Sequence, residues 1–131
     1  MKDIEFIREY LNRYQKSLLE NDVSDYMISM KKLLLQTRDK GNKVLIAGNG
    51  GSAAMASHVS VDLTKQAGIR TVNFNEADLI TCFANDYGYE NWVAKSIEFY
   101  GDEGDVAILI SSSGKSANMI NAAVQANSMG I

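Results

Sequence analysis

Serine and glycine residues cluster at two places in this 131-residue chain. In the segment 111–116, four of the six residues are serine: Ser111, Ser112, Ser113 and Ser116. The segment 48–53 reads Gly-Asn-Gly-Gly-Ser-Ala. Serine hydroxyls, and backbone N–H groups that glycines leave accessible, are donors that can hold the oxygens of a phosphate monoester without a cation. Both segments therefore indicate phosphate binding.

Each segment also fits another pattern. Residues 48–53 match the dinucleotide-binding pattern Gly-x-Gly-x-x-(Gly/Ala). That pattern also needs an acidic residue at the end of the next strand to bind the ribose hydroxyls, and the nearest candidate, Glu76, lies past the end of that strand. A nucleoside-triphosphate loop ending at Gly114 would need a glycine where the chain has Leu109. Serines before a helix are also common helix caps. Four serines in six residues, beside a second glycine-rich segment, favour phosphate binding.

Other polar residues have open roles. His58, the single histidine, lies four residues before Asp62 on a predicted helix, so the two share a face. Such a pair is half of a metal site, an acid and base pair, or a surface hydrogen bond. Asn85 and Asp86 lie in a predicted turn, where Asp86 either forms the turn or accepts from sugar hydroxyls. Cys82, the single cysteine, is expected to be a buried small apolar residue.

The elements that must position these residues alternate between strands and helices. Three apolar runs predict strands: 43–47, 69–74 and 105–110. Four further segments predict helices: 54–66, 76–83, 90–100 and 117–129. This alternation predicts an α/β fold with a parallel sheet covered by helices on both faces, which binds ligands beyond the carboxyl ends of its strands. There we also expect the unpaired first amides of the following helices.

Two amphipathic helices, 3–20 and 23–39, precede the sheet. Apolar residues spaced by three and four form a stripe on the first: Ile4, Ile7, Tyr10, Leu11, Tyr14 and Leu18. Because a small sheet offers limited surface to cover, this stripe is expected to pack on another subunit. We predict one domain, with an N-terminal helical oligomerisation region at 1–40 and the first part of the α/β sheet at 43–131.

The overall composition excludes several classes of partner. The chain has 13 basic and 16 acidic residues and a formal net charge of −3, without the concentrated basic face that nucleic-acid binding needs. No apolar run reaches the roughly 18 residues of a membrane helix, and the N-terminus lacks the apolar segment of a secretory signal. We therefore expect a cytoplasmic protein with neither nucleic acid nor membrane as partner.

Four motifs, in this order, resemble the sugar isomerase (SIS) domain family: 48–52 followed by His58, then 84–89, 103–106 and 111–116. The likeness is strongest to the aldose–ketose isomerases of the family that convert sedoheptulose 7-phosphate to D-glycero-manno-heptose 7-phosphate through an enediol, for bacterial surface polysaccharide. The resemblance implies a flavodoxin-like three-layer fold and a homotetramer built through the N-terminal helices.

The resemblance also implies roles for single residues. Substrate contacts are implied for Asn49, Gly50, Gly51 and Ser52, contacts to sugar hydroxyls for Asn85 and Asp86, and phosphate contacts for Ser111, Ser112, Ser113 and Ser116. His58 would be a zinc ligand. Asp62 stands where the family has glutamate and would be both zinc ligand and catalytic base. The family's remaining zinc ligands, a glutamine and a histidine, lie beyond residue 131, so the zinc site is incomplete here and we expect the chain to be truncated.

Two other functions stay open. A non-catalytic SIS protein, such as a partner of the replication initiator DnaA, would keep the sugar-phosphate scaffold and act through its surface. Asp62 and the missing ligands favour it, whereas the intact serine segment and the Asn85–Asp86 pair favour the isomerase. A nicotinamide-dependent enzyme is the third and weakest possibility.

Overall fold

The computed structural model describes residues 2–131, which divide after Lys32 into two compact units. The first unit contains α1 (Asp3–Tyr14), the π-helical turn η1 (Gln15–Leu19) and the beginning of α2 (Ser24–Asp39). Helix α1 passes into η1 without leaving helical backbone angles, as predicted for residues 3–20. Neither α1 nor η1 has a buried residue, so every apolar side chain of the predicted stripe is exposed in this chain.

The second unit is built around a three-stranded parallel sheet. Its strands are β1 (Val44–Gly48), β2 (Thr71–Asn73) and β3 (Val106–Ile110), in the order β2-β1-β3. Central strand β1 is buried at every position. Strand β2 is shorter than the predicted 69–74 because the amide of Ile69 donates to Leu63 at the end of the preceding helix, at 2.9 Å, and so turns away from the sheet.

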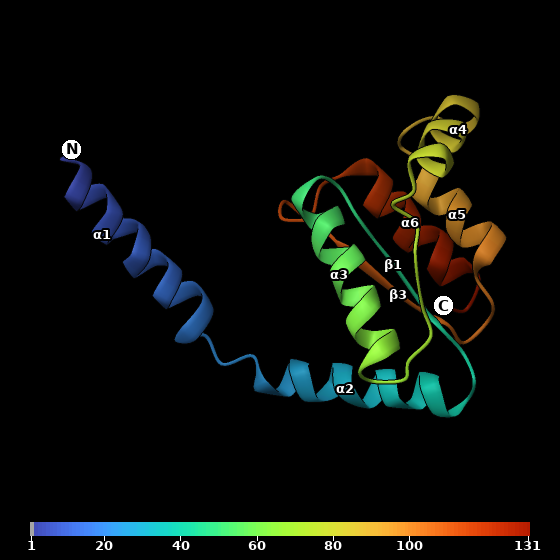
Figure 1. Ribbon diagram of the computed structural model, residues 1–131, viewed down its shortest axis with the longest axis horizontal. Helices are drawn as coiled ribbons and strands as arrows, with labels where there is room; N and C mark the ends of the chain where they lie inside the picture. The colour runs from blue at the N-terminus through green and yellow to red at the C-terminus, as the bar shows by residue number, and fades with distance from the viewer. Residues whose placement is uncertain (1) are drawn as a thin grey trace. The chain divides into compact units, whose positions relative to one another are not determined.

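Helices cover both faces of this sheet, as predicted (Figure 1). The remaining helices are α3 (Gly51–Lys65), α4 (Ala77–Tyr87), α5 (Trp92–Tyr100) and α6 (Ala117–Ser128). Alternate residues of β1 serve opposite faces, as a strand's period of two requires. Leu45 packs with Trp92 of α5 and Met119 of α6, whereas Val44 packs with Leu34 of α2 and Leu63 of α3. The result is a three-layer α/β fold.

Helix α4 extends further than predicted. The turn expected at 84–89 is wrong for residues 84–87, because α4 continues to Tyr87 and ends only at Gly88, whose φ of 87° leaves the helix. Asn85 and Asp86 therefore lie in the last helical turn and not in a loop. The prediction of a buried Cys82 is also wrong, because its side of α4 faces solvent and the thiol is exposed.

A buried carboxylate fastens the amino ends of β1 and β3. Asp105, with 3% of its surface exposed, accepts hydrogen bonds from the Lys43 amide at 2.9 Å, the Lys43 ammonium at 2.6 Å and the Asp102 amide at 2.9 Å. Burial alone would raise the pKa of Asp105, but the bonds from Lys43 and Asp102 lower it. These contacts hold the amino ends of β1 and β3 together. The serine and glycine segments follow the carboxyl ends of the same two strands, at the other edge of the sheet.

Candidate functional site

Neighbouring parallel strands bring the two predicted phosphate-binding segments to one edge of the sheet. We name residues 48–53 the glycine loop and residues 111–116 the serine loop. Strands β1 and β3 pair in a register that sets Gly48 opposite Ile110, the residue just before the serine loop. Both loops therefore leave the carboxyl edge side by side, and each leads into a helix, α3 or α6. This placement confirms the expected arrangement.

The shape of the glycine loop depends on glycine at two positions. A Cβ atom on Gly48 would lie 2.5 Å from the backbone C and O atoms of Ser52, so no side chain fits there. Gly50 precedes α3 with a φ of 55°, in the region that favours glycine. Helix α3 thus begins at Gly51, inside the loop and three residues before the predicted start.

The amides of the glycine loop are only partly free. The Ser52 and Ala53 amides donate to the carbonyls of Asn49 and Gly50, each at 3.0 Å, so the expectation that all the first amides of this helix are unpaired is wrong. These two amides form hydrogen bonds to the carbonyl three residues earlier, as in a tight first helical turn. Within residues 2–131, the N–H groups of Gly50 and Gly51 have no acceptor. These two amides are the backbone donors that the loop can offer to an anion.

Hydroxyl groups shape the serine loop without capping its helix. Ser111 Oγ accepts from the Gly114 amide at 3.2 Å and lies 3.3 Å from Ser116 Oγ, while Ser113 Oγ accepts from the Lys115 amide at 3.1 Å. Ser116 occupies the N-cap of α6, but its side chain makes no capping bond, which counts against the helix-cap interpretation. A hydroxyl that accepts from an amide keeps its own O–H donor for a phosphate oxygen.

The beginning of α6 adds positive potential to this edge. In the described part of the chain, the amides of Ala117 and Asn118 have no acceptor, and a helix N-terminus attracts anions through such groups and the helix dipole. Lys115 lies exposed in the serine loop and forms no ion pair with any residue of 2–131. The serine loop is therefore suited to an anionic group despite the negative charge of the whole chain.

Two residues that sequence reasoning missed hold the side chain of Asn49 in the glycine loop. Asn118, buried at the start of α6, exchanges two hydrogen bonds with Asn49 of the glycine loop, at 2.9 and 3.0 Å. The hydroxyl of Tyr89, just after α4, donates to Asn49 Oδ1 at 3.1 Å. A polar side chain at a core-facing helical position, next to Met119, was the available signal for Asn118.

Asn85 and Asp86 contact each other and not the loops. Asn85 Nδ2 donates to Asp86 Oδ1 at 2.9 Å, and the Cys82 thiol lies 3.7 Å from Asp86 Oδ2. The negative charge of Asp86 is the main cause that raises the pKa of the Cys82 thiol. No hydrogen bond among residues 2–131 joins Asn85 or Asp86 to either loop.

His58 and Asp62 lie away from the loops on an exposed face of α3. His58 Nε2 is 3.6 Å from Asp62 Oδ2, and the two side chains are 80% and 56% exposed. Asp62 comes eleven residues after Gly51, which corresponds to about 16 Å along the helix axis at 1.5 Å per residue. The structure does not bring this predicted base to the loops of its own subunit.

The residues present do not fit a zinc site. Zinc in proteins has three or four protein ligands, and His58 with Asp62 supplies two. Across residues 2–131 there is no group of three histidine, cysteine, aspartate or glutamate side chains that could hold a metal ion.

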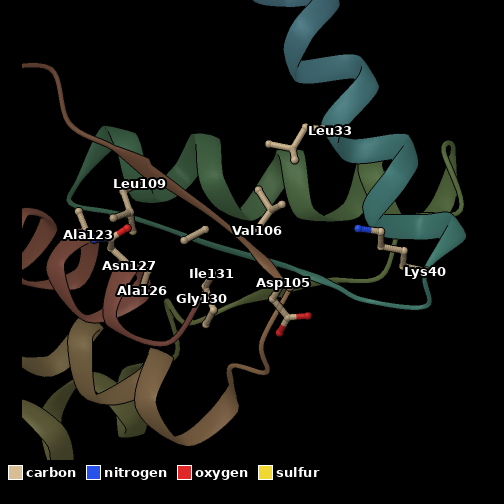
Figure 2. A pocket seen from close by; sticks show the side chains of 12 residues that line it. Leu33, Lys40, Asp105, Val106, Leu109, Ala123, Ala126, Asn127, Gly130 and Ile131 are labelled. Atoms are coloured by element: carbon tan, nitrogen blue, oxygen red, sulfur yellow. The ribbon is translucent and has the colours of Figure 1, made fainter.

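A cavity of about 500 Å³ lies elsewhere, along the outer edge of β3 (Figure 2). The labelled residues come from β3, α2 and α6, with Val106, Leu33 and Ala126 among them, and from the segments that adjoin these elements. Within the described residues β3 pairs with β1 alone, so the cavity follows the unpaired side of this edge strand. No predicted site residue lines it, and we assign the candidate site to the two loops instead.

Comparison with known proteins defines the class of this chain. The model of the SIS domain matches residues 6–131, and the chain belongs to the SIS domain family. The resemblance seen in the motifs is therefore confirmed. None of the helices in residues 2–131 has the length and apolar character to span a membrane.

Several relatives and solved structures are named phosphoheptose isomerase. The enzyme of Fusobacterium nucleatum is 43% identical over 97 residues, which cover 70% of this chain and 50% of the relative. That of Sodalis glossinidius is 35% identical over 137 residues, covering 97% and 70%. The structure from Neisseria gonorrhoeae superposes with a TM-score of 0.87 at 30% identity, over 97% of this chain and 71% of that one. The structure from Francisella tularensis superposes with a TM-score of 0.89 at 25% identity, over 99% and 72%.

The match to this chain covers only part of each relative's length. The chain spans about half the length of the first curated relatives, 50% for Fusobacterium nucleatum and 55% for Helicobacter pylori.

Proposed function

We propose that this chain binds sedoheptulose 7-phosphate between the glycine and serine loops and isomerises it to D-glycero-manno-heptose 7-phosphate. The observation that carries the proposal is the register of β1 and β3, which sets Gly48 opposite Ile110 and so presents both loops at one edge. The similarity to proteins named phosphoheptose isomerase supports this choice of sugar. A substrate of this polarity does not cross a membrane unaided, which supports a cytoplasmic reaction in heptose biosynthesis for surface polysaccharide.

The phosphate is assigned to the serine loop. Its oxygens would accept from the hydroxyls of Ser111, Ser112, Ser113 and Ser116. The free amides of Ala117 and Asn118 and the charge of Lys115 would stabilise the dianion. The sugar is assigned to the glycine loop, through the Asn49 side chain, the Gly50 and Gly51 amides and Ser52. Asn85 and Asp86 would contact sugar hydroxyls only after exchanging their present bonds for new ones.

The chemistry is a proton transfer between adjacent carbons. A base takes a proton from C1 of the ketose while the carbonyl oxygen on C2 gains one, which forms the enediol. A proton then returns to C2 and the C1 hydroxyl loses its proton, which gives the aldose. We assign the base to Asp62. No step of this scheme uses zinc, because ligands beyond His58 and Asp62 would have to come from outside the described residues.

The position of Asp62 calls for a second subunit. Because it lies about 16 Å along α3 from Gly51 of the glycine loop, it would act on sugar held by a neighbouring chain. The exposed apolar stripe of α1 and η1 supports a homo-oligomer, which we propose to be a tetramer. Light scattering should give the mass of four chains, and Leu11→Glu with Leu18→Glu should lower it. A wild-type monomer would contradict this part of the proposal.

The binding site is tested by removing two hydroxyls. The double variant Ser112→Ala with Ser116→Ala should bind sedoheptulose 7-phosphate at least about 1.5 kcal/mol more weakly, roughly tenfold, because two hydrogen bonds to a charged group are lost. Isothermal titration calorimetry measures this change. Ser128→Ala is the matched control, because Ser128 lies at the opposite end of α6 from Ser116 and its hydroxyl donates to the Gln125 carbonyl. Equal affinity in the double variant and the wild type would rule out the serine loop as phosphate site.

The observations on Asp62 and the zinc ligands favour a second candidate, a non-catalytic SIS protein. Such a protein would bind the sugar phosphate and show no isomerisation in a coupled assay. Capture of the replication initiator DnaA by the full chain, unchanged in the Ser112 and Ser116 double variant, would support this alternative. Turnover that disappears in Asp62→Asn would reject it.

A further inference from the structure

The amide pair of Asn49 and Asn118 joins segments far apart in the chain. Asn118 is the second residue of α6 and has 3% of its surface exposed. Its Nδ2 donates to Asn49 Oδ1 at 2.9 Å, and Asn49 Nδ2 donates to Asn118 Oδ1 at 3.0 Å. Because an amide buried without partners is costly, the two bonds hold the Asn118 amide against the Asn49 amide.

A third group completes this arrangement. The Tyr89 hydroxyl donates to Asn49 Oδ1 at 3.1 Å, so that oxygen accepts two hydrogen bonds, its full capacity. One of the two Nδ2 hydrogens of Asn49 is used by Asn118. The other N–H is what the Asn49 side chain has left for a ligand.

The pair also sets the direction of that N–H. An isolated amide can exchange its oxygen and nitrogen by rotating about χ2, which would present an acceptor where a donor was. Here a rotation of Asn49 alone would set its N–H groups against the Asn118 N–H group and its oxygen against Asn118 Oδ1, and both amide–amide hydrogen bonds would be lost. The cost of orienting Asn49 is thus met in the folded protein before any ligand binds.

We propose that Asn118 is a positioning residue, assisted by Tyr89, which holds the Asn49 amide so that its remaining N–H donates to an oxygen of the bound sugar. The inference rests on the proposed function, since it takes the glycine loop as the sugar-binding segment. Neither residue need touch the sugar itself, because both act through Asn49.

A double-mutant cycle tests this indirect role. Binding of sedoheptulose 7-phosphate is measured calorimetrically for the wild type, Asn118→Ala, Asn49→Ala and the double variant. Asn118→Ala should weaken binding at least about fivefold in the wild-type background and less than about twofold in the Asn49→Ala background. A merely structural role would weaken binding equally in both.

Asn121→Ala is the matched control. Asn121 lies one turn further along α6 and donates to Glu90 O and Asn91 Oδ1, at 2.9 and 3.1 Å, without reaching the glycine loop. It should leave affinity within about twofold of the wild type. If Asn118→Ala does not fold, the same cycle with Tyr89→Phe decides, because Tyr89 is 55% exposed and this substitution removes only its hydroxyl.

The outcomes separate the two proposals. Wild-type binding with no loss in Asn118→Ala, or with equal loss in both backgrounds, overturns the positioning role and leaves the proposed function standing. A wild-type chain that does not bind the sugar phosphate overturns both. Loss confined to the background that contains Asn49 supports both.

Discussion

A methyl group at residue 48 tests whether the glycine loop depends on close backbone approach. In Gly48→Ala the new Cβ would lie 2.5 Å from the backbone C and O atoms of Ser52 and 2.8 Å from its Cβ. Non-bonded carbon atoms rest at about 3.5 Å or more, so the first turn of α3 must move by about 1 Å. No flexible side chain can give way, because these atoms belong to the helix backbone or lie directly on it.

The displacement should reduce both stability and binding. Overpacking of a tight contact costs about 1–3 kcal/mol in free energy of unfolding. A shift of about 1 Å in a group that positions substrate is worth up to 10²-fold in rate. We therefore expect sugar-phosphate affinity to fall at least about tenfold.

Gly51→Ala gives the matched comparison for stability. Its Cβ would have no atom within 4 Å, and its φ lies outside the region that favours glycine. In the first turn of α3, alanine in place of glycine should raise the free energy of unfolding by up to about 1 kcal/mol. The two substitutions thus have opposite expected signs.

Urea unfolding followed by far-ultraviolet circular dichroism measures the stability change, and calorimetric titration with sedoheptulose 7-phosphate measures the binding. If Gly48→Ala unfolds at the wild-type urea concentration and binds with wild-type affinity, the close approach of Gly48 to Ser52 does not shape the loop. A larger loss of stability in Gly51→Ala than in Gly48→Ala would contradict the reasoning as well.

Two further predictions concern charged groups. Asp105→Asn should lower the free energy of unfolding at pH 7 by about 3 kcal/mol, because it removes the buried partner of Lys43, whereas Asp102→Asn, at a side chain 79% exposed, should cost less than about 1 kcal/mol. Because the folded-state pKa of Asp105 is lowered, its contribution to stability is present above about pH 4 and is lost as the pH falls through the folded pKa. The free energies of unfolding of the wild type and Asp105→Asn should therefore converge in urea melts at acid pH. An equal difference between them at pH 7 and pH 3 would refute this. Alkylation of Cys82 by iodoacetamide at pH 8 should be about threefold faster in Asp86→Asn, because the Asp86 charge raises the thiol pKa, and should change less in Asp78→Asn, whose charge contributes less. Equal rates in the wild type and Asp86→Asn would show that the carboxylate does not control the thiol.

The strands, most helices and both loops were predictable because their signals are local. The apolar run before Gly48 and the alternation of strands with helices follow from the period and composition of short segments. The parallel sheet then follows, because connections through helices return each strand in the same direction. The expectation that the glycine and serine loops meet at one edge needed no tertiary information beyond that topology, and the pairing of Gly48 with Ile110 confirms it.

Other features depend on contacts between distant segments, which no local pattern contains. Asn49 and Asn118 pair only because β1 and β3 are neighbours, so the partner of each amide is 69 residues away. Asn85 and Asp86 have turn-forming chemistry, yet α4 includes them because the helix ends only where Gly88 leaves it. The exposure of Cys82 depends on which side of α4 packs on the core. The distance of Asp62 from the glycine loop follows from the helix that carries it away from the edge. Residue types and spacing therefore determined which chemistry this chain offers, whereas tertiary packing decided which groups meet, because burial and hydrogen bonding are settled only when separate elements come together.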